Sequence, residues 1–167
     1  AATSYSVHDL PLLPFYIFYS MFGFQRVGDL IWAAADQRAR GFLIGATAGR
    51  TTLGGEGLQH QDGTSQVAAS MVPNCRAYDP AFAGELAVIL DHGARQMMEQ
   101  GLDVFYYITV MNESYAQPSL PASVHADVIK GMYSFARHEG ERGQVHLLGS
   151  GAIFREVLAA AEMLQKD

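Results

Sequence analysis

FYIFY, at residues 15–19, is the stretch of sequence that decides the fold class. Pro11 and Pro14 precede it, and its five consecutive residues are all aromatic or β-branched. Such a run is typical of a strand that is buried on both faces, as the strands of parallel sheets are. From Phe22 onward the apolar residues recur at helical spacing instead, up to a stop at Gly41. A buried strand followed directly by a helix is therefore expected.

The same alternation continues along the chain. Further strands are expected at 42–47, 75–78, 104–110 and 145–148, and further helices at 65–72, 80–100, 127–136 and 152–165. The helix that opens at Pro80 has Asp79 in the position of an N-cap. Strands that alternate with helices predict an α/β fold with a mostly parallel sheet flanked by helices.

A glycine-rich segment, residues 47–63, fits no regular element. It holds five glycines in 17 residues and has little apolar periodicity. Long irregular loops inside a compact domain are usually functional or disordered. His60 lies in this segment among polar residues, where a histidine can transfer a proton or bind a carboxylate. The alternative is an exposed histidine without a task.

Tyr19 and Phe22 lie where the first expected strand gives way to a helix. In open α/β sheets, ligands bind outside the carboxyl ends of the strands. Aromatic side chains at that position can hold a flat ring by stacking. The alternative is that both aromatic residues belong to the core, as is expected of Met21 and Trp32.

The turn Gly149-Ser150-Gly151 resembles a shortened phosphate-binding turn between a strand and a helix. The dinucleotide-binding fingerprint would place a third glycine at position 154, which is Phe154. A turn that packs a helix against a strand is therefore favoured over a nucleotide site.

Charge and cysteine content exclude several classes of function. The net charge is −6, and no cluster of Lys or Arg could follow a phosphate backbone, so nucleic acid is not an expected partner. Cys75 is the single cysteine, which rules out a disulfide framework and fits the reducing cytoplasm. The histidines have no ligand spacing, so no metal site is predicted. No stretch approaches the roughly 20 apolar residues that cross a bilayer, so no membrane is expected to be a partner.

The surface is expected to be poor in charge, because only 17% of the residues are charged against about 25% in ordinary soluble domains. Either another domain or subunit normally covers part of it, or the chain is one compact, well-packed domain. Since the first residue is not Met and the last expected helix has no successor, both ends are expected to be cut.

Several runs together resemble one family. They are PFYIFYSMFGFQR at 14–26, AGRTTL at 48–53, GEGLQH at 55–60, PN at 73–74, YDP at 78–80, YYIT at 106–109 and NE at 112–113. The combination is similar to the homodimeric-type pyruvate dehydrogenase component of bacterial 2-oxo-acid dehydrogenase complexes, in the transketolase superfamily. The resemblance extends over essentially the whole chain.

The resemblance implies an enzyme that uses thiamine diphosphate to decarboxylate pyruvate oxidatively and to transfer the acetyl unit to a lipoyl group. Phe22, by its match in the first run, would stack on the aminopyrimidine ring of the cofactor. Tyr19 would lie beside that ring and the reacting carbon, and His60 would point into the substrate end of the cleft. The chain departs from the family at Thr64, where a second histidine is expected, which puts the local hydrogen bonding in doubt.

The resemblance also implies how the chain is divided and what it lacks. Residues 1–140 would be the later part of the pyrimidine-binding domain, and 141–167 the start of the C-terminal domain. The glutamate that drives tautomerisation of the aminopyrimidine would lie upstream, and magnesium would be held by a domain absent from this chain. This chain alone is therefore expected to be inactive.

The implied partners are a second copy in a homodimer and the dihydrolipoyl acetyltransferase component. Two alternatives stay open. The chain could come from another enzyme of the superfamily, which acts on a different 2-oxo acid or a sugar phosphate, or it could be a non-catalytic structural module.

Overall fold

A computed structural model describes residues 1–49, 57–138 and 143–166 of the chain. The sheet within these residues has four parallel strands in the order β1-β2-β4-β3. They are β1 (Phe15–Tyr19), β2 (Phe42–Ala46), β3 (Cys75–Tyr78) and β4 (Phe105–Thr109). The predicted α/β fold with a parallel sheet is confirmed.

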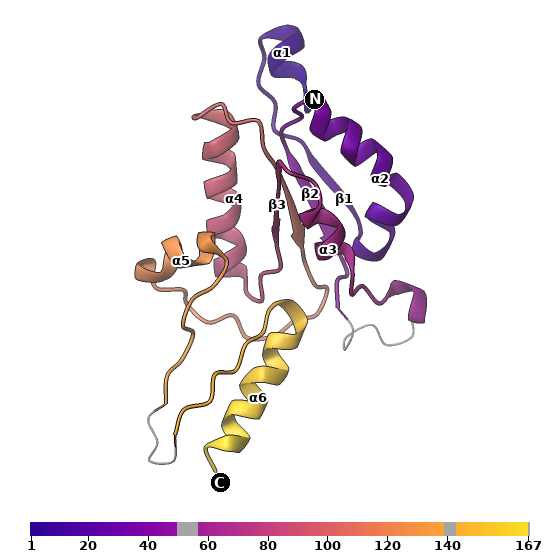
Figure 1. Ribbon diagram of the computed structural model, residues 1–167. Helices are drawn as coiled ribbons and strands as arrows, with labels where there is room; N and C mark the ends of the chain where they lie inside the picture. Colours follow the sequence, from indigo (N-terminus) through magenta and orange to yellow (C-terminus); the bar gives the residue numbers. More distant parts are fainter. Residues whose placement is uncertain (50–56, 139–142, 167) are drawn as a thin grey trace.

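Helices cover both faces of this sheet. The helices of the described residues are α1 (Ser4–His8), α2 (Ser20–Asp36), α3 (Ser65–Ser70), α4 (Ala83–Met98), α5 (His125–Lys130) and α6 (Phe154–Leu164). The 3₁₀ turns are η1 (Leu58–His60), η2 (Ala122–Val124) and η3 (Gly151–Ile153). α2 and α3 lie on one face and α4 on the other, with α5 beside α4 (Figure 1). Every residue of the inner strand β4 is buried. Tyr106 belongs to the core under α4, and Tyr107 belongs to the core under α2 and α3.

The strand at residues 15–19 forms as predicted, but the prediction that it is buried on both faces is wrong. β1 lies at the edge of the sheet. Its side chains Phe15, Tyr16, Ile17 and Tyr19 are 55, 58, 66 and 49% exposed. The prediction that Trp32 belongs to the core is also wrong, since its side chain is 44% exposed. Local sequence shows apolar character, whereas burial requires a neighbouring element, and none of the described residues pairs with the outer edge of β1.

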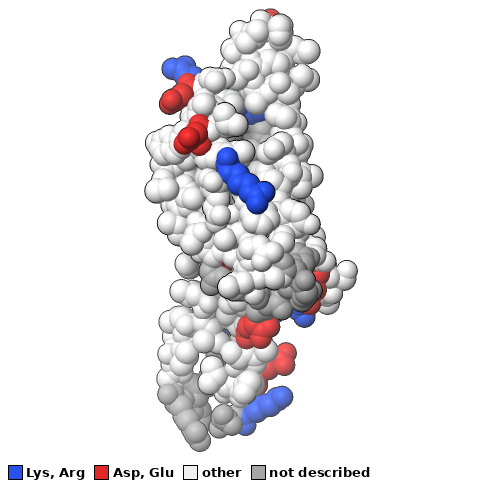
Figure 2. Space-filling model, turned by 90° about the vertical axis from the view of Figure 1, so that its right-hand side faces the viewer, with Lys and Arg blue, Asp and Glu red and all other residues white. Residues whose placement is uncertain are grey.

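These exposed residues belong to two neighbouring elements, β1 and α2. We call four of their exposed apolar side chains, Tyr16, Ile17, Leu30 and Trp32, the β1–α2 face. The side on which α2 and β1 lie carries few charged residues (Figure 2). This side of the surface is thus poor in charge, as the composition predicted for the surface.

The expectation that Asp79 caps a helix starting at Pro80 is wrong. α4 begins at Ala83, with Phe82 in the N-cap position. The carboxylate of Glu85 reaches back and accepts the N–H groups of Ala81 at 2.6 Å and of Phe82 at 3.2 Å. These bonds satisfy donors that a helix start leaves without a partner within the helix. Asp79 is engaged elsewhere.

Two predicted elements near the C-terminal end also differ. The helix expected at 127–136 ends at Lys130, because Gly131 adopts the left-handed conformation with φ 95°. In the described part of the chain, no strand forms at 145–148, where Val145 is 74% and Leu148 71% exposed. An extended segment becomes a strand only where a second strand accepts its hydrogen bonds.

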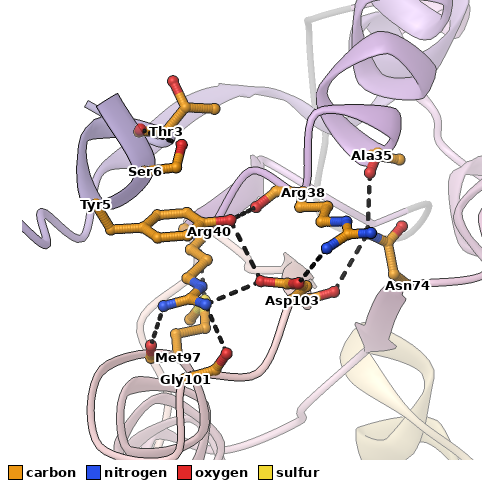
Figure 3. Close-up of polar contacts among 11 residues, drawn as sticks. Thr3, Tyr5, Ser6, Ala35, Arg38, Arg40, Asn74, Met97, Gly101 and Asp103 are labelled. Carbon is orange, nitrogen blue, oxygen red and sulfur yellow. Dashed lines mark hydrogen bonds and ion pairs between the residues drawn. The ribbon is translucent and has the colours of Figure 1, made fainter. Parts of the chain in front are cut away.

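Arg40 ties the N-terminal helix to the amino ends of the strands (Figure 3). Its guanidinium donates to the carbonyls of Met97 at 3.1 Å and Gly101 at 2.5 Å and to the carboxylate of Asp103 at 2.9 Å, and it lies 3.7 Å from the centre of the Tyr5 ring. The hydrogen bond from Arg40 is the main cause that lowers the pKa of Asp103. This cluster fixes the end of the sheet opposite to the one where ligands of α/β folds bind.

Candidate functional site

Tyr19 and Phe22 come from the junction of β1 and α2. Tyr19 is the last residue of β1 and the N-cap of α2, with extended backbone angles φ −63° and ψ 125°. The helix begins at Ser20, so Phe22 follows within its first turn. Parallel strands bring their carboxyl ends to one edge of the sheet, where ligands bind in open α/β folds. Both aromatic residues therefore lie at the expected edge.

His60 joins them from η1. Its ring centre lies 5.3 Å from that of Tyr19 and 5.1 Å from that of Phe22. The ring centres of Tyr19 and Phe22 are 6.1 Å apart. The rings meet edge to face, with interplanar angles of 69°, 72° and 68° for these three pairs. We call Tyr19, Phe22 and His60 the aromatic cluster. Three residues that the sequence analysis selected separately thus lie together.

The alternatives for these residues do not fit their surroundings. Tyr19 is 49% exposed and Phe22 half-buried, so they are not an ordinary core pair. His60 is half-buried and packs against two rings, so it is not a loose surface histidine. The aromatic cluster is instead a partly open surface at the carboxyl ends of the strands.

Arg26 covers one face of Phe22. Its guanidinium carbon lies 4.2 Å from the centre of the Phe22 ring, one helical turn further along α2. A cation in this position interacts favourably with the ring face. A flat ligand ring that stacks on Phe22 must therefore use the face that Arg26 leaves open. Sequence reasoning missed Arg26, although its i, i+4 spacing from Phe22 was visible.

Asp62 anchors the segment that carries His60, and sequence reasoning missed it as well. Its carboxylate accepts the N–H groups of Thr64 at 3.1 Å and Ser65 at 3.0 Å, and the Ser65 hydroxyl donates to its second oxygen. An acidic residue just before a short helix is the signal that could have found this contact, because such residues satisfy the first free N–H groups. The loop carrying His60 is thereby attached to the start of α3.

The ionised form of Asp62 is stabilised. Burial has the largest influence and opposes ionisation, but the hydrogen bonds from Ser65 and Thr64 help to outweigh it and lower the pKa of Asp62. Its carboxylate is therefore charged at neutral pH, as an acceptor of several hydrogen bonds should be.

Two buried hydroxyls lie beneath the aromatic cluster. Ser20 is 1% and Tyr107 0% exposed, and within the described residues neither hydroxyl oxygen has a partner that meets hydrogen-bond geometry. Burial raises the pKa of Tyr107 well above its usual range. Both hydroxyls are thus uncharged, buried polar groups near the start of α2.

The Gly149-Ser150-Gly151 turn contacts a carboxylate rather than offering a phosphate site. The Ser150 hydroxyl donates to Asp79 at 2.7 Å, and the N–H of Gly151 donates to the Asp79 carbonyl at 3.0 Å. The other oxygen of the Asp79 carboxylate accepts the Thr109 hydroxyl at 2.6 Å. An anionic ligand would be repelled there, so nucleotide binding is not supported. The expected packing of a helix against a strand at this turn is not seen either, because the described residues directly before the turn form no strand.

Other candidate sites are weaker within the residues that the structure describes. A hollow of about 460 Å³ lies between α4 and α5, with His92 and His125 in its wall, and does not reach the aromatic cluster. The described residues contain no group of three metal-binding side chains, and none of their helices is long and apolar enough to cross a membrane. Cys75 is buried, and burial raises its pKa to about 12, which disfavours the reactive thiolate.

Comparison with known families shows to which protein family the chain belongs. Residues 1–118 match the family described as the pyruvate dehydrogenase E1 component middle domain. The chain belongs to the pyruvate dehydrogenase E1 component family. The family that the sequence runs predicted is therefore confirmed.

Curated relatives in this family are similar over the whole of this chain. The pyruvate dehydrogenase E1 components of Pseudomonas aeruginosa, Cupriavidus necator and Escherichia coli are 62%, 59% and 57% identical to it. The alignments cover 100% of this chain but 19% of each relative. The chain thus spans about a fifth of the length of the curated relatives that it matches.

Solved structures support the fold of this pyruvate dehydrogenase E1 segment. A split-gene transketolase, described as an inactive tetramer of four beta subunits, matches with a TM-score of 0.62 and 18% identity. The match covers 99% of this chain and 48% of the transketolase chain. The transketolase of Campylobacter jejuni matches with a TM-score of 0.53 and 17% identity over 66% of this chain and 16% of its own. At these identities the likeness shows the fold alone, which is the transketolase-like α/β arrangement.

Proposed function

We propose that this chain is part of a thiamine-diphosphate-dependent enzyme that decarboxylates pyruvate oxidatively and transfers the acetyl unit to a lipoyl group. The single observation that carries the proposal is the aromatic cluster at the carboxyl ends of the strands, in a chain of the pyruvate dehydrogenase E1 component family. Two of its members suit a flat heteroaromatic ring, and the third suits proton transfer or binding of a carboxylate.

The residues of the aromatic cluster fit the pyrimidine end of the cofactor. When bound, thiamine diphosphate supplies a carbon nucleophile and an electron sink for decarboxylation. Phe22 offers the ring face that Arg26 does not cover, and Tyr19 borders it with a half-exposed ring. These two side chains would bind the aminopyrimidine and orient it.

His60 and Tyr19 would act on the substrate. Pyruvate carries a carboxylate and a 2-oxo group, and negative charge develops on the oxygen of that group when its carbon is attacked. Hydrogen-bond donors fixed in advance stabilise such charge most strongly where water is excluded. The imidazole of His60 and the hydroxyl of Tyr19 lie on one side of the proposed pocket, with ring centres 5.3 Å apart.

The remaining walls of the pocket would come from elsewhere, since the aromatic cluster is partly open, with Tyr19 49% exposed. We propose a second copy of the component, in a homodimer, as the element that covers it and the nearby β1–α2 face, whose side chains are 44–68% exposed and apolar. Exposed apolar surface is typical of protein interfaces, and this side of the molecule carries few charges (Figure 2). Magnesium would be held by a domain absent from this chain.

Three further proposals concern organisation. Residues 1–140 would be the later part of the pyrimidine-binding domain and 141–167 the start of the C-terminal domain, which the family match over 1–118 supports for the first part. The proposed boundary falls at 139–142, outside the described residues. The dihydrolipoyl acetyltransferase component would be a partner, and the cytoplasm the compartment, which a single buried cysteine suits.

Replacing His60 with alanine tests the proposed function. In the full-length protein that carries this segment, His60→Ala is expected to lower kcat/KM for pyruvate about 100-fold or more, because one positioned acid–base group typically contributes that much. The measurement is the pyruvate-dependent reduction of an artificial electron acceptor. His8→Ala is the matched control, because His8 is an exposed histidine on α1. Equal activity of the two variants would remove His60 from the site.

The isolated 167-residue chain is expected to show no turnover of pyruvate with added thiamine diphosphate and magnesium. The reason is that the aromatic cluster supplies only part of one pocket, and catalysis needs positioned groups on all sides of the reacting atoms. The same assay checks this expectation. Turnover above that of a heat-treated sample would contradict it.

A further inference from the structure

Asp62 connects the His60 segment to α3. Only Gln61 separates it from His60 in sequence, and its carboxylate accepts hydrogen bonds from Thr64 and Ser65 at the start of α3. An acceptor of three hydrogen bonds restricts the backbone between η1 and α3 to one path. The position of His60 thus depends on where this carboxylate is held.

α3 is itself fixed to the sheet. The side-chain amide of Gln66 donates to the carbonyl of Tyr78 at 2.8 Å and to the hydroxyl of Thr109 at 3.0 Å. Tyr78 and Thr109 are the last residues of β3 and β4. Asp62 is therefore attached to a rigid part of the fold at the carboxyl ends of the strands.

The His60 segment contacts the junction that carries the other two members of the aromatic cluster. η1 packs against α2, and the ring centre of His60 lies 5.3 Å from that of Tyr19 and 5.1 Å from that of Phe22. Asp62 thus attaches to α3 the segment whose histidine meets the β1–α2 junction.

We propose that Asp62 is a positioning residue of the proposed active site: it touches neither cofactor nor substrate but holds His60 against Tyr19 and Phe22. The proposal rests on the proposed function. A catalytic group that shifts by about 1 Å can lose on the order of 100-fold in rate, so the anchor of a loop residue has a measurable effect on turnover.

The test is a double-mutant cycle in the full-length protein with saturating thiamine diphosphate and magnesium. Asp62→Asn is expected to lower kcat/KM for pyruvate about 10- to 100-fold, because the amide keeps the shape but replaces one acceptor oxygen by a donor. The double variant with His60→Ala is expected to match His60→Ala alone, because a displaced residue that is already absent costs nothing further. Asp91→Asn is the control, since Asp91 is an exposed carboxylate paired with Arg95 on α4.

Each outcome separates the inference from the proposed function. If His60→Ala itself keeps full activity, the proposed function fails. If His60→Ala is impaired but Asp62→Asn is not, or if the two effects multiply, the role assigned to Asp62 is overturned while the proposed function stands. Should Asp62→Asn fail to fold, Ser65→Ala removes one donor to the same carboxylate and is expected to lower kcat/KM about threefold. Unchanged activity of Ser65→Ala would then overturn the role.

Discussion

Replacing Glu85 with alanine is expected to destabilise this part of the protein by about 3–5 kcal/mol. Glu85 is 7% exposed, and its carboxylate accepts the N–H groups of Ala81 and Phe82 and the Tyr133 hydroxyl at 2.6, 3.2 and 2.6 Å. Alanine would leave three donors in a buried place without an acceptor, each at a cost of roughly 1–3 kcal/mol before relaxation. The loss is large because the start of α4 and the Tyr133 segment depend on the same carboxylate.

Hydrogen exchange measures this effect locally, which matters in a protein several times longer than the chain. Peptides that contain Ala81 and Phe82 should exchange much faster in the full-length Glu85→Ala variant, and the unfolding midpoint should fall by several degrees. Glu99→Ala is the control: its carboxylate is 65% exposed and lies 3.8 Å from Arg95, a geometry worth well under about 1 kcal/mol. Equal protection in the two variants would show that Glu85 does not organise this turn.

The second large effect is expected from Gly45→Ala, in the inner strand β2 beneath the proposed site. A methyl group at Gly45 would lie 2.5 Å from the hydroxyl oxygen of Tyr107 and 2.9 Å from Cβ of Ser20. Neither neighbour can move easily, because both are almost fully buried. Forced overpacking of this kind costs about 1–3 kcal/mol. Since Ser20 opens α2, the displacement should also disturb Tyr19 and lower pyruvate turnover.

Gly28→Ala is the matched control and should have the opposite sign. Gly28 lies within α2, and nothing lies within 4 Å of the place where a Cβ would be added. Glycine inside a helix is less favourable than alanine by about 0.5–1 kcal/mol, so this variant should be slightly more stable. Thermal unfolding of the full-length variants distinguishes the two positions. A Gly45→Ala protein as stable as Gly28→Ala would contradict the prediction, because it would mean that Tyr107 and Ser20 can move to accommodate the methyl group.

The sequence analysis succeeded where local pattern and structure coincide. The runs at 42–47, 75–78 and 104–110 predicted β2, β3 and β4 because short apolar runs with aromatic and β-branched residues need a pleated, buried backbone. Tyr19, Phe22 and His60 were selected from their places at a strand end and in a glycine-rich segment. Their catalytic and cofactor-binding roles stay predictions until the His60 variant is measured.

Two of the failures share one cause, which is that a contact depends on residues far away in sequence. Asp79 has the sequence position of a helix cap, yet its carboxylate accepts the hydroxyls of Thr109 and Ser150 instead. The carboxylate of Glu85 accepts the N–H groups at the helix start. The run at 145–148 looks like a strand, yet no described strand pairs with it.

The sequence by itself determined the α/β class, the family and the residue types available for chemistry, because these follow from local periodicity and from runs of matched residues. Only the tertiary structure decided that FYIFY lies exposed at the edge of the sheet and that the rings of Tyr19, Phe22 and His60 lie together. The physical reason is that burial and hydrogen bonding are properties of pairs of surfaces. The sequence of a single segment gives the side chains that it can bury or hydrogen-bond. Which other segment they pack against is decided only when the chain folds.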